Sequence, residues 1–222
     1  SKQIECLVTC PVSKEAINLA GYRFPGHTEY LAACSRTRDV VMMLLNDRLK
    51  FSLVSRHVPL RKVAAQVGEN NVYKTIIMTD KALRRLFLIG HPRIAVCALN
   101  PHASDNGLLG TEENALIGPQ VKRARRSVPS LDGPLPADTA IAKAMRKEYD
   151  CCIAMYHDQA LIPLKITGFD TGVNITLGLP FVRTSPLHGT GFDIAATGHA
   201  DPGSLIHAIT LALRCTLHQK KG

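Results

Sequence analysis

The chain has 222 residues, 45% hydrophobic and 20% charged, a composition typical of a globular protein with a substantial core in one or two domains. No apolar run approaches the roughly 20 residues of a membrane-spanning helix, so we expect no membrane partner. The seven cysteines are odd in number and form no CxxC pair, which argues against a disulfide framework and indicates a reducing compartment. Because the sequence shows no signal peptide, the expected location is the cytoplasm.

The formal net charge of +9 raises the question of nucleic-acid binding. The basic residues form scattered groups, tryptophan is absent, and aromatic residues make up only 5% of the chain, so no basic stripe with interleaved aromatics is visible. A basic balance equally suits an enzyme that attracts an anionic substrate and a dinucleotide. We therefore expect catalysis and no nucleic-acid partner.

Hydrophobic periodicity predicts alternating strands and helices. In chain order we expect a strand at 4–9, a helix at 14–20, strands at 39–45 and 49–54 joined by a turn at 46–47, helical segments at 59–67 and 73–88, a strand at 93–99, a helix at 112–125, a Pro-rich connection at 127–138, a helix at 140–148, a buried strand at 151–155 and a closing helix at 205–217. The first strand is also expected to be buried. This alternation predicts an α/β fold with a largely parallel sheet.

Three histidines each follow an apolar, strand-like run: His57, His102 and His157. Neutral imidazoles suit zinc and similar divalent metals, and three protein ligands with one open position are typical of a catalytic site. The spacings of 45 and 55 residues match no compact metal motif, and the chain holds nine histidines, so chance placement stays an open alternative.

Polar side chains recur in the segment 156–198. Asp158 follows His157 directly, and Lys165, Asn174 and Arg183 come next, separated by glycines. A lysine and an arginine brought together among glycines form a receptor for a phosphate or a carboxylate, because arginine supplies a fork and lysine a point charge. The alternative is three solvated side chains on unrelated loops.

Several blocks of sequence together resemble the 4-hydroxythreonine-4-phosphate dehydrogenase family. They are GHTEYL at 26–31, RHVPLR at 56–61, LNPHASD at 99–105, GPLPADT at 133–139, and YHDQ, VNITLGLPFVRTS, HGT and DIA between 156 and 195. They run in family order along nearly the whole chain. The family is NAD-dependent and serves vitamin B6 synthesis, and its wider membership includes dehydrogenases of threonate or erythronate phosphates and of aromatic cis-dihydrodiols.

The resemblance implies an isocitrate/isopropylmalate dehydrogenase-like fold, with two α/β domains and a cleft between them. It assigns 22–166 to a central metal-binding and dimerisation domain, and 1–21 with 167–222 to the remainder of the nucleotide-binding domain. Family members begin with a further segment that carries a GDPxGIGPE-type motif, so the N-terminal portion is expected to be absent from this sequence.

The resemblance also implies roles for individual residues. His57, His102 and His157 match the family's metal ligands, for zinc first, with magnesium or cobalt as alternatives, in a site shared between the subunits of a homodimer. The substrate-binding positions are His27, Thr28, Lys165, Asn174 and Arg183, which suit a phosphorylated hydroxy acid. The catalytic base is Asp158, Lys165 or a water molecule. For Thr28, capping of a helix at 29–33 is the structural alternative.

Cofactor binding rests on HGTGFDIAATG at 188–198, which is not a GxGxxG fingerprint but resembles the adenosine-binding loop of isocitrate and isopropylmalate dehydrogenases. It implies contacts to NAD or NADP from His188, Gly189, Thr190 and Asp193. Leu187 stands where the family often has Asp.

The sequence thus predicts metal-dependent oxidation of 4-phosphohydroxy-L-threonine by NAD to a β-keto acid, which decarboxylates to 3-amino-2-oxopropyl phosphate. Alternatives are a family dehydrogenase acting on threonate or erythronate 4-phosphate or on a cis-dihydrodiol, and a non-catalytic remnant that binds metal or phosphate.

Overall fold

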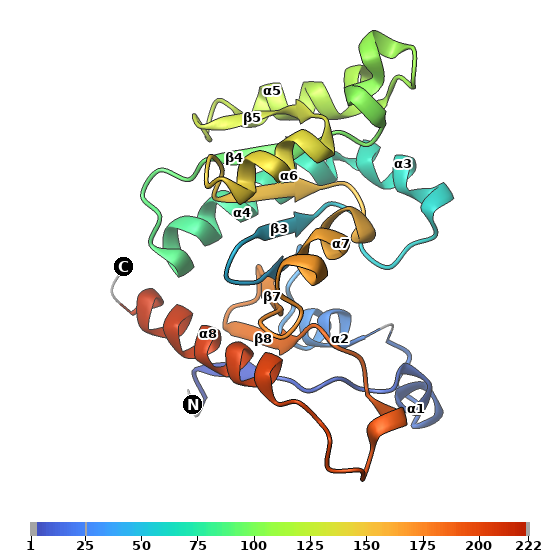
Figure 1. Ribbon diagram of the computed structural model, residues 1–222, viewed down its shortest axis with the longest axis vertical. Helices are drawn as coiled ribbons and strands as arrows, with labels where there is room; N and C mark the ends of the chain where they lie inside the picture. Colours follow the sequence, from blue (N-terminus) through green and yellow to red (C-terminus); the bar gives the residue numbers. More distant parts are fainter. Residues whose placement is uncertain (1–3, 25, 221–222) are drawn as a thin grey trace.

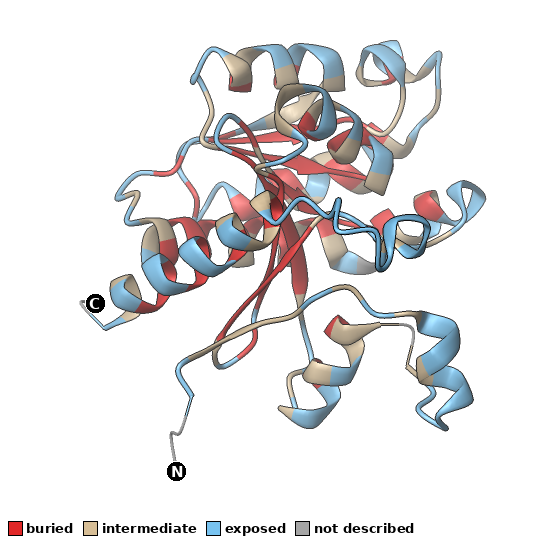
Figure 2. Ribbon diagram, turned by 60° about the horizontal axis from the view of Figure 1, so that its bottom comes forward, coloured by how far each residue is buried: buried red, intermediate tan, exposed pale blue. Residues whose placement is uncertain are grey.

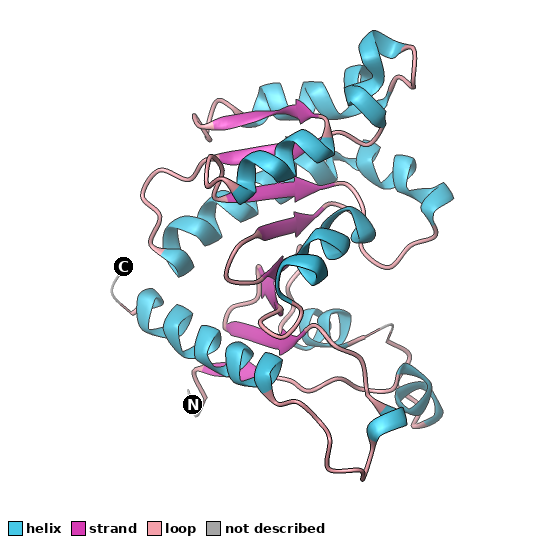
Figure 3. Cartoon of the chain, viewed as in Figure 1, coloured by secondary structure: helices cyan, strands magenta, loops and turns pink. Residues whose placement is uncertain are grey.

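A mixed eight-stranded sheet runs through the computed structural model, which describes residues 4–24 and 26–220 (Figure 3). Its strand order is β1-β8-β7-β2-β3-β6-β4-β5. The strands are β1 (Cys6–Val8), β2 (Val41–Leu45), β3 (Lys50–Leu53), β4 (Ile94–Cys97), β5 (Leu131–Leu135), β6 (Cys151–Ala154), β7 (Val173–Leu177) and β8 (Val182–Pro186).

The predicted α/β class is confirmed, but the sheet is less parallel than expected. The β1–β8, β3–β6, β6–β4 and β4–β5 pairs are parallel, whereas β8–β7, β7–β2 and β2–β3 are antiparallel. Short turns join β2 to β3 and β7 to β8, and a short turn permits only antiparallel pairing.

Helices cover both faces of the sheet (Figure 1). The helix α4 packs with α5 and α8 in one apolar layer, and α6 packs with α7 in the other. The helices are α1 (Lys14–Leu19), α2 (His27–Cys34), α3 (Val63–Gln66), α4 (Val72–Phe87), α5 (Gly118–Ala124), α6 (Ala137–Met145), α7 (His157–Gly168) and α8 (Gly203–Gln219), with short 3-10 or π segments η1 (Leu60–Lys62), η2 (Val67–Asn71), η3 (Pro101–Gly107), η4 (Glu113–Ile117) and η5 (Phe192–Ile194). Within the described ranges, no helix combines the length and apolar character needed to cross a bilayer.

Burial is uneven along the chain (Figure 2). The central strands β2 and β6 are buried over their whole length, whereas α1 buries no residue and α2 buries only Thr28 and Ala32. The strand β1 is only half-buried, which corrects the expectation of a buried strand at 4–9. It is an edge strand with a neighbour on one side only, so it is less covered than a central strand.

Two further expectations were wrong or incomplete. The segment 127–138 contains the strand β5 and the start of α6, not only a connection. Its Gly133–Pro134 pair resembles a loop signal, but an edge strand tolerates proline because one side of its backbone has no strand partner. The segment 156–198, for which only site residues were predicted, contains α7, β7 and β8, and α7 accommodates Pro163.

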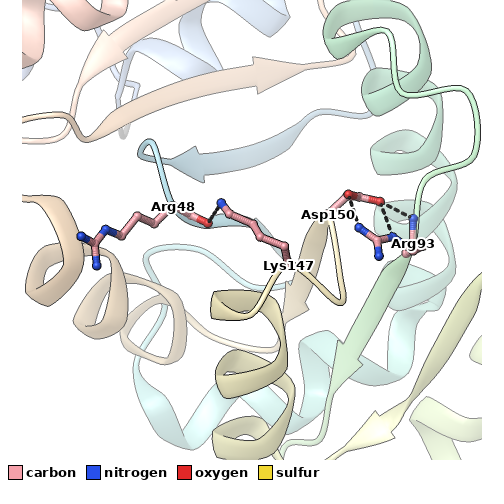
Figure 4. A network of polar contacts seen from close by, with 4 residues as sticks. All are labelled: Arg48, Arg93, Lys147 and Asp150. Atoms are coloured by element: carbon pink, nitrogen blue, oxygen red, sulfur yellow. Dashed lines mark hydrogen bonds and ion pairs between the residues drawn. The ribbon is translucent and has the colours of Figure 1, made fainter.

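Polar contacts tie together the amino ends of the parallel strands (Figure 4). Asp150, just before β6, accepts hydrogen bonds from the backbone N–H of Arg93 at 2.8 Å and from its guanidinium Nη2 at 3.0 Å. Lys147 Nζ donates to the carbonyl of Arg48 at 3.0 Å, close to the start of β3. These contacts lie at the amino ends of β3, β4 and β6. The three predicted metal-binding histidines follow the carboxyl ends of the same strands, on the opposite side of the sheet.

The predicted domain division separates two groups of adjacent strands. Strands β1, β8 and β7 belong to the 1–21 and 167–222 group, and the other five strands belong to 22–166. The antiparallel β2–β7 pair joins the groups, with Leu44 opposite Asn174. The sheet is continuous across the predicted boundary, and the division itself stays a prediction.

Helix α8 holds β8 in place, and this packing can be tested. Leu211 is 4% exposed in the apolar layer over β7 and β8, whereas Leu213 on the same helix is 58% exposed. We expect Leu211→Ala to lower the free energy of unfolding by about 2–5 kcal/mol, because it leaves a cavity in a packed layer. Leu213→Ala is the control and should change it by less than about 0.5 kcal/mol. Urea unfolding measures both, and equal effects would contradict this packing.

Candidate functional site

Two of the predicted metal ligands meet at the carboxyl edge of the sheet. His57 follows β3 and His157 follows β6, and these strands pair in parallel as neighbours. The ring centroids lie 5.5 Å apart. His157 Nδ1 is 2.7 Å from the Asp158 carboxylate, which can only accept a hydrogen bond when ionised, so the proton belongs on Nδ1 and the lone pair on Nε2 is free. Such a carboxylate–histidine pair typically supports a metal-binding imidazole.

The surroundings of His57 keep its imidazole neutral. Burial lowers the pKa of His57 most, and the positive charges of Lys14 and Arg56 lower it further, while Glu29 acts in the opposite direction. A neutral imidazole is the form that binds a metal ion. Both histidines therefore present suitable nitrogen ligands.

The third predicted ligand, His102, does not join this pair of histidines within one copy of the chain. It follows β4, at the same edge of the sheet, but its side chain is exposed. Across 4–24 and 26–220, no group of three or more His, Cys, Asp or Glu residues is placed to hold a metal ion. The structure therefore brings together two of the three predicted ligands.

The loop that carries His102 has an uncommon backbone. Five consecutive non-glycine residues, from His102 to Asn106, have φ between +43° and +65°, a left-handed turn. This conformation costs about 1–2 kcal/mol per residue for L-amino acids, so the surrounding structure must stabilise it.

A buried carboxylate anchors the start of this loop. Glu113 accepts hydrogen bonds from the backbone N–H groups of Leu99 and Asn100, both at 2.8 Å, and from the Asn100 side chain at 2.9 Å. Burial alone raises the pKa of Glu113, but these hydrogen bonds outweigh it and hold the pKa below its ordinary value. Gly110 has φ +119°, and a Cβ there would lie 2.5 Å from Asn100 Nδ2, so the loop returns too closely for any other residue.

Arg183 lies at the centre of the predicted substrate site. It is 3% exposed on β8, and its Nη2 and Nη1 donate to the hydroxyls of Thr9 at 2.6 Å and Thr176 at 3.1 Å. Its buried Nε has no hydrogen-bond partner in the described chain. Burial lowers the pKa of Arg183 to about 10, with Glu29 opposing this shift, so the guanidinium remains charged at neutral pH. A buried donor without an acceptor is costly, and an anionic ligand would relieve this cost.

Asn174 and His27 lie near Arg183, and Thr28 follows His27 on α2. Asn174 lies on β7 opposite Ser185; its Nδ2 donates to Ser185 Oγ at 3.4 Å, and its buried Oδ1 has no partner among the described residues. Burial and then the charge of Arg183 lower the pKa of His27. Thr28 is buried within α2, whose N-cap is Gly26, so the capping alternative for Thr28 is wrong.

Lys165 lies on a different surface. It is exposed on α7, with its Nζ 5.4 Å from the ring centre of Phe169, and it lines a small hollow with Leu187 and His188. The structure describes no contact between Lys165 and Arg183. Of the predicted substrate residues, Asn174 lies on the strand next to that of Arg183 and His27 lies within reach of its charge, whereas Lys165 faces the predicted cofactor loop.

Two charged residues near the histidine pair, Glu29 and Arg56, were not predicted from the sequence. Glu29 on α2 lies 3.6 Å from Arg56 Nη1 and acts electrostatically on both His57 and Arg183. Arg56 directly precedes His57, yet the pattern gave no reason to separate it from the other scattered basic residues. Their presence inside the GHTEYL and RHVPLR blocks was the only available signal.

The predicted cofactor loop lines an open cleft of about 850 Å³. The predicted residues His188, Gly189, Thr190 and Asp193 all line it, together with the start of α8. A cleft of this volume suits a ligand of cofactor size. In this loop Ala196 has φ +63° and Gly191 φ +61°, so both occupy the left-handed region.

A mixed sheet with helices on both faces, a histidine pair after two parallel strands and a buried arginine on β8 define a protein of the α/β class. The sequence model described as "Pyridoxal phosphate biosynthetic protein PdxA" matches residues 1–212. The chain belongs to this family, which confirms the predicted resemblance.

Individual relatives agree with this assignment. The chain is 49% identical to 4-hydroxythreonine-4-phosphate dehydrogenase from Bradyrhizobium diazoefficiens, over 94% of this chain and 61% of the relative. It is 46% identical to D-threonate 4-phosphate dehydrogenase from Pectobacterium atrosepticum, over 96% and 65%. The crystal structure of 4-hydroxythreonine-4-phosphate dehydrogenase from Klebsiella pneumoniae has a TM-score of 0.86 at 42% identity, over 96% and 65%. The chain therefore spans less than two thirds of the length of these relatives.

The lowered pKa of His27 predicts a pH-dependent stability. Below the ordinary pKa of 6.5, the unfolded chain binds a proton at His27 more readily than the folded chain does, so the free energy of unfolding falls as the pH falls through 6.5. We expect His27→Gln to reduce this fall, measured by urea unfolding between about pH 5.5 and 7.5. His91→Gln, at an exposed histidine, is the control. An unchanged slope in His27→Gln would contradict the burial of His27.

The left-handed positions of the cofactor loop predict opposite effects of two substitutions. Ala196→Gly should raise the free energy of unfolding by about 0.5–1 kcal/mol, because glycine adopts positive φ without strain. Gly191→Ala should lower it by about 1 kcal/mol for the same reason. Chemical denaturation of both variants measures the difference, and effects of equal sign would show that the loop does not hold this backbone.

Proposed function

We propose that this chain carries the metal- and substrate-binding site of an NAD-dependent dehydrogenase that oxidises 4-phosphohydroxy-L-threonine in pyridoxal phosphate biosynthesis. The product is a β-keto acid, which loses carbon dioxide to give 3-amino-2-oxopropyl phosphate. The observation that carries this proposal is the His57–His157 pair together with the buried, incompletely bonded Arg183. Family membership supports the reaction, and the name of the Bradyrhizobium relative supports the substrate.

D-Threonate 4-phosphate is the second candidate substrate, and the Pectobacterium relative supports it. The two substrates differ at C2, which carries an amino group in hydroxythreonine and a hydroxyl in threonate; erythronate 4-phosphate has the same groups as threonate. The buried donor of Arg183 favours any of these phosphate esters over a cis-dihydrodiol, which lacks the phosphate.

The histidine pair fits a divalent metal, with zinc as the first candidate and magnesium or cobalt as alternatives. His57 is neutral and His157 has a free Nε2, so both suit a metal, and we propose His102 of the partner subunit as the third ligand. A metal bound there supplies a Lewis acid that lowers the pKa of the substrate hydroxyl.

Exposed apolar residues near these histidines support a homodimer. Leu60 lies three residues beyond His57, and Leu108 and Leu109 follow the His102 loop; all three are exposed, Leu108 at 82%. Large exposed apolar side chains around a polar site are typical of an interaction surface. A second copy of the chain that covers this surface brings its own His102 to the pair.

The side chains then divide the remaining tasks. Arg183 and Asn174 bind the phosphate, and neutral His27 forms a hydrogen bond to the substrate. Asp158 orients His157 through Nδ1, so it serves best as a positioning residue. Lys165, which lies towards the cofactor loop, or a water molecule then takes the proton of the substrate hydroxyl.

NAD or NADP supplies the hydride chemistry, and the cleft formed by the 188–198 loop is its proposed site. In this proposal 22–166 form the metal-binding and dimerisation domain, 1–21 and 167–222 belong to the nucleotide-binding domain, and the enzyme works in the cytoplasm.

NADH formation with 4-phosphohydroxy-L-threonine and with D-threonate 4-phosphate, with zinc added or chelated, tests the proposal. We expect metal-dependent turnover, and loss of both turnover and bound metal in His57→Gln and His102→Ala. Co-expression of these two variants should restore about a quarter of wild-type turnover, because half of the dimers are mixed and each mixed dimer has one intact site.

His91→Gln should retain both metal and turnover, because His91 is an exposed histidine outside the site. Turnover without bound metal would reject the assigned ligands. Metal retained by His102→Ala, or no recovery in the mixed dimers, would reject the shared site.

A further inference from the structure

Arg56 is a second arginine with an incompletely bonded guanidinium at this site. Its Nη1 is buried and has no hydrogen-bond partner among the described residues. The nearest anionic group is Glu29 Oε1 at 3.6 Å, which is longer than a hydrogen bond. The backbone turns sharply here, with the Val58 N–H donating to the Arg56 carbonyl at 3.0 Å, so Arg56 directly precedes the metal-binding His57 at a bend and not within a strand.

Glu29 acts electrostatically on both arginines that have an unsatisfied N–H. It forms an ion pair with Arg56, and its charge also acts on Arg183. One carboxylate cannot satisfy both guanidinium groups, and each arginine keeps one buried N–H without an acceptor among the described residues.

The proposed substrates have two anionic groups, a phosphate on C4 and a carboxylate on C1, with the reacting hydroxyl on C3 between them. Arg183 donates to the hydroxyls of Thr9 and Thr176, and Asn174 adds an amide group on the neighbouring strand, a set suited to the several oxygens of a phosphate. Arg56 offers an arginine fork beside His57, which suits the two oxygens of a carboxylate.

We propose that Arg56 binds the carboxylate of the substrate and so positions C3 at the histidine pair, while Arg183 binds the phosphate. The assignment rests on the proposed function, because it takes a phosphorylated hydroxy acid as the ligand. It makes Arg56 a substrate-binding residue. The competing explanation is that Arg56 only holds Glu29 in place.

Calorimetric titration separates these explanations, since it measures binding without turnover. The ligands are 4-phosphohydroxy-L-threonine, D-threonate 4-phosphate and glycerol 3-phosphate, which keeps the phosphate and the neighbouring hydroxyl but lacks the carboxylate. The variants are Arg56→Met, Arg56→Lys and, as a matched control at an exposed arginine, Arg61→Met.

Of the two carboxylated ligands, the test uses the one that the wild-type protein binds. We expect Arg56→Met to weaken binding of this ligand by about 10- to 100-fold, the usual effect of losing a charged hydrogen bond. Glycerol 3-phosphate should bind Arg56→Met and wild type equally. Arg56→Lys, which keeps the charge but not the fork, should bind the carboxylated ligand with intermediate affinity. Arg61→Met should behave as wild type.

Equal weakening of all three ligands in Arg56→Met would overturn the proposal, because it would show that Arg56 acts through Glu29 and the shape of the site. Unchanged binding of the carboxylated ligand would overturn it as well. Arg56→Lys gives the same comparison if Arg56→Met fails to fold, which a thermal melt reveals. Failure of the wild-type protein to bind any of the three phosphate esters would instead reject the proposed function.

Discussion

The parallel pairing of β3 with β6 is the contact on which the site depends. Phe51 lies opposite Cys152 and Leu53 opposite Ala154, in a register that ends both strands at the same level of the sheet. These residues are fully or almost fully buried in one apolar layer, so a one-residue shift of register would move them into the layer on the opposite face and disrupt the packing of both. The register therefore places the residues that follow each strand, His57 and His157, side by side. The backbone N–H and the hydroxyl of Ser55, which both donate to the Met155 carbonyl, extend this pairing beyond the strands.

Incomplete hydrogen bonding distinguishes the site from the rest of the interior. Three of the four buried side-chain atoms that lack a partner in the described chain belong to Arg56, Asn174 and Arg183. The fourth is Ser104 Oγ in the left-handed turn, whereas Glu113 nearby is satisfied by its hydrogen bonds from the backbone of Leu99 and Asn100. Such a concentration of unsatisfied donors and acceptors lowers stability, and in the proposed function the substrate relieves this cost when it binds.

Sequence patterns predicted the strands best where the apolar run was continuous, as in β2 and β6, and so they placed the three histidines correctly after their strands. They failed where local signals conflicted with tertiary packing. Pro163 concealed α7, and the Gly133–Pro134 pair concealed an edge strand. The ion pair between Glu29 and Arg56 depends on how α2 meets the segment that follows β3. Long-range geometry of that kind has no counterpart in periodicity or spacing.

The left-handed turn at 102–106 has a consequence for sequence change. Branched side chains such as those of valine and isoleucine are strongly disfavoured at positive φ, whereas alanine, serine, aspartate and asparagine, the residues found after His102, are small or able to bond to their own backbone. Loops at a protein surface usually diverge freely among homologues. At these positions the handedness of the backbone restricts the acceptable residues, so this exposed loop should diverge as slowly as the core.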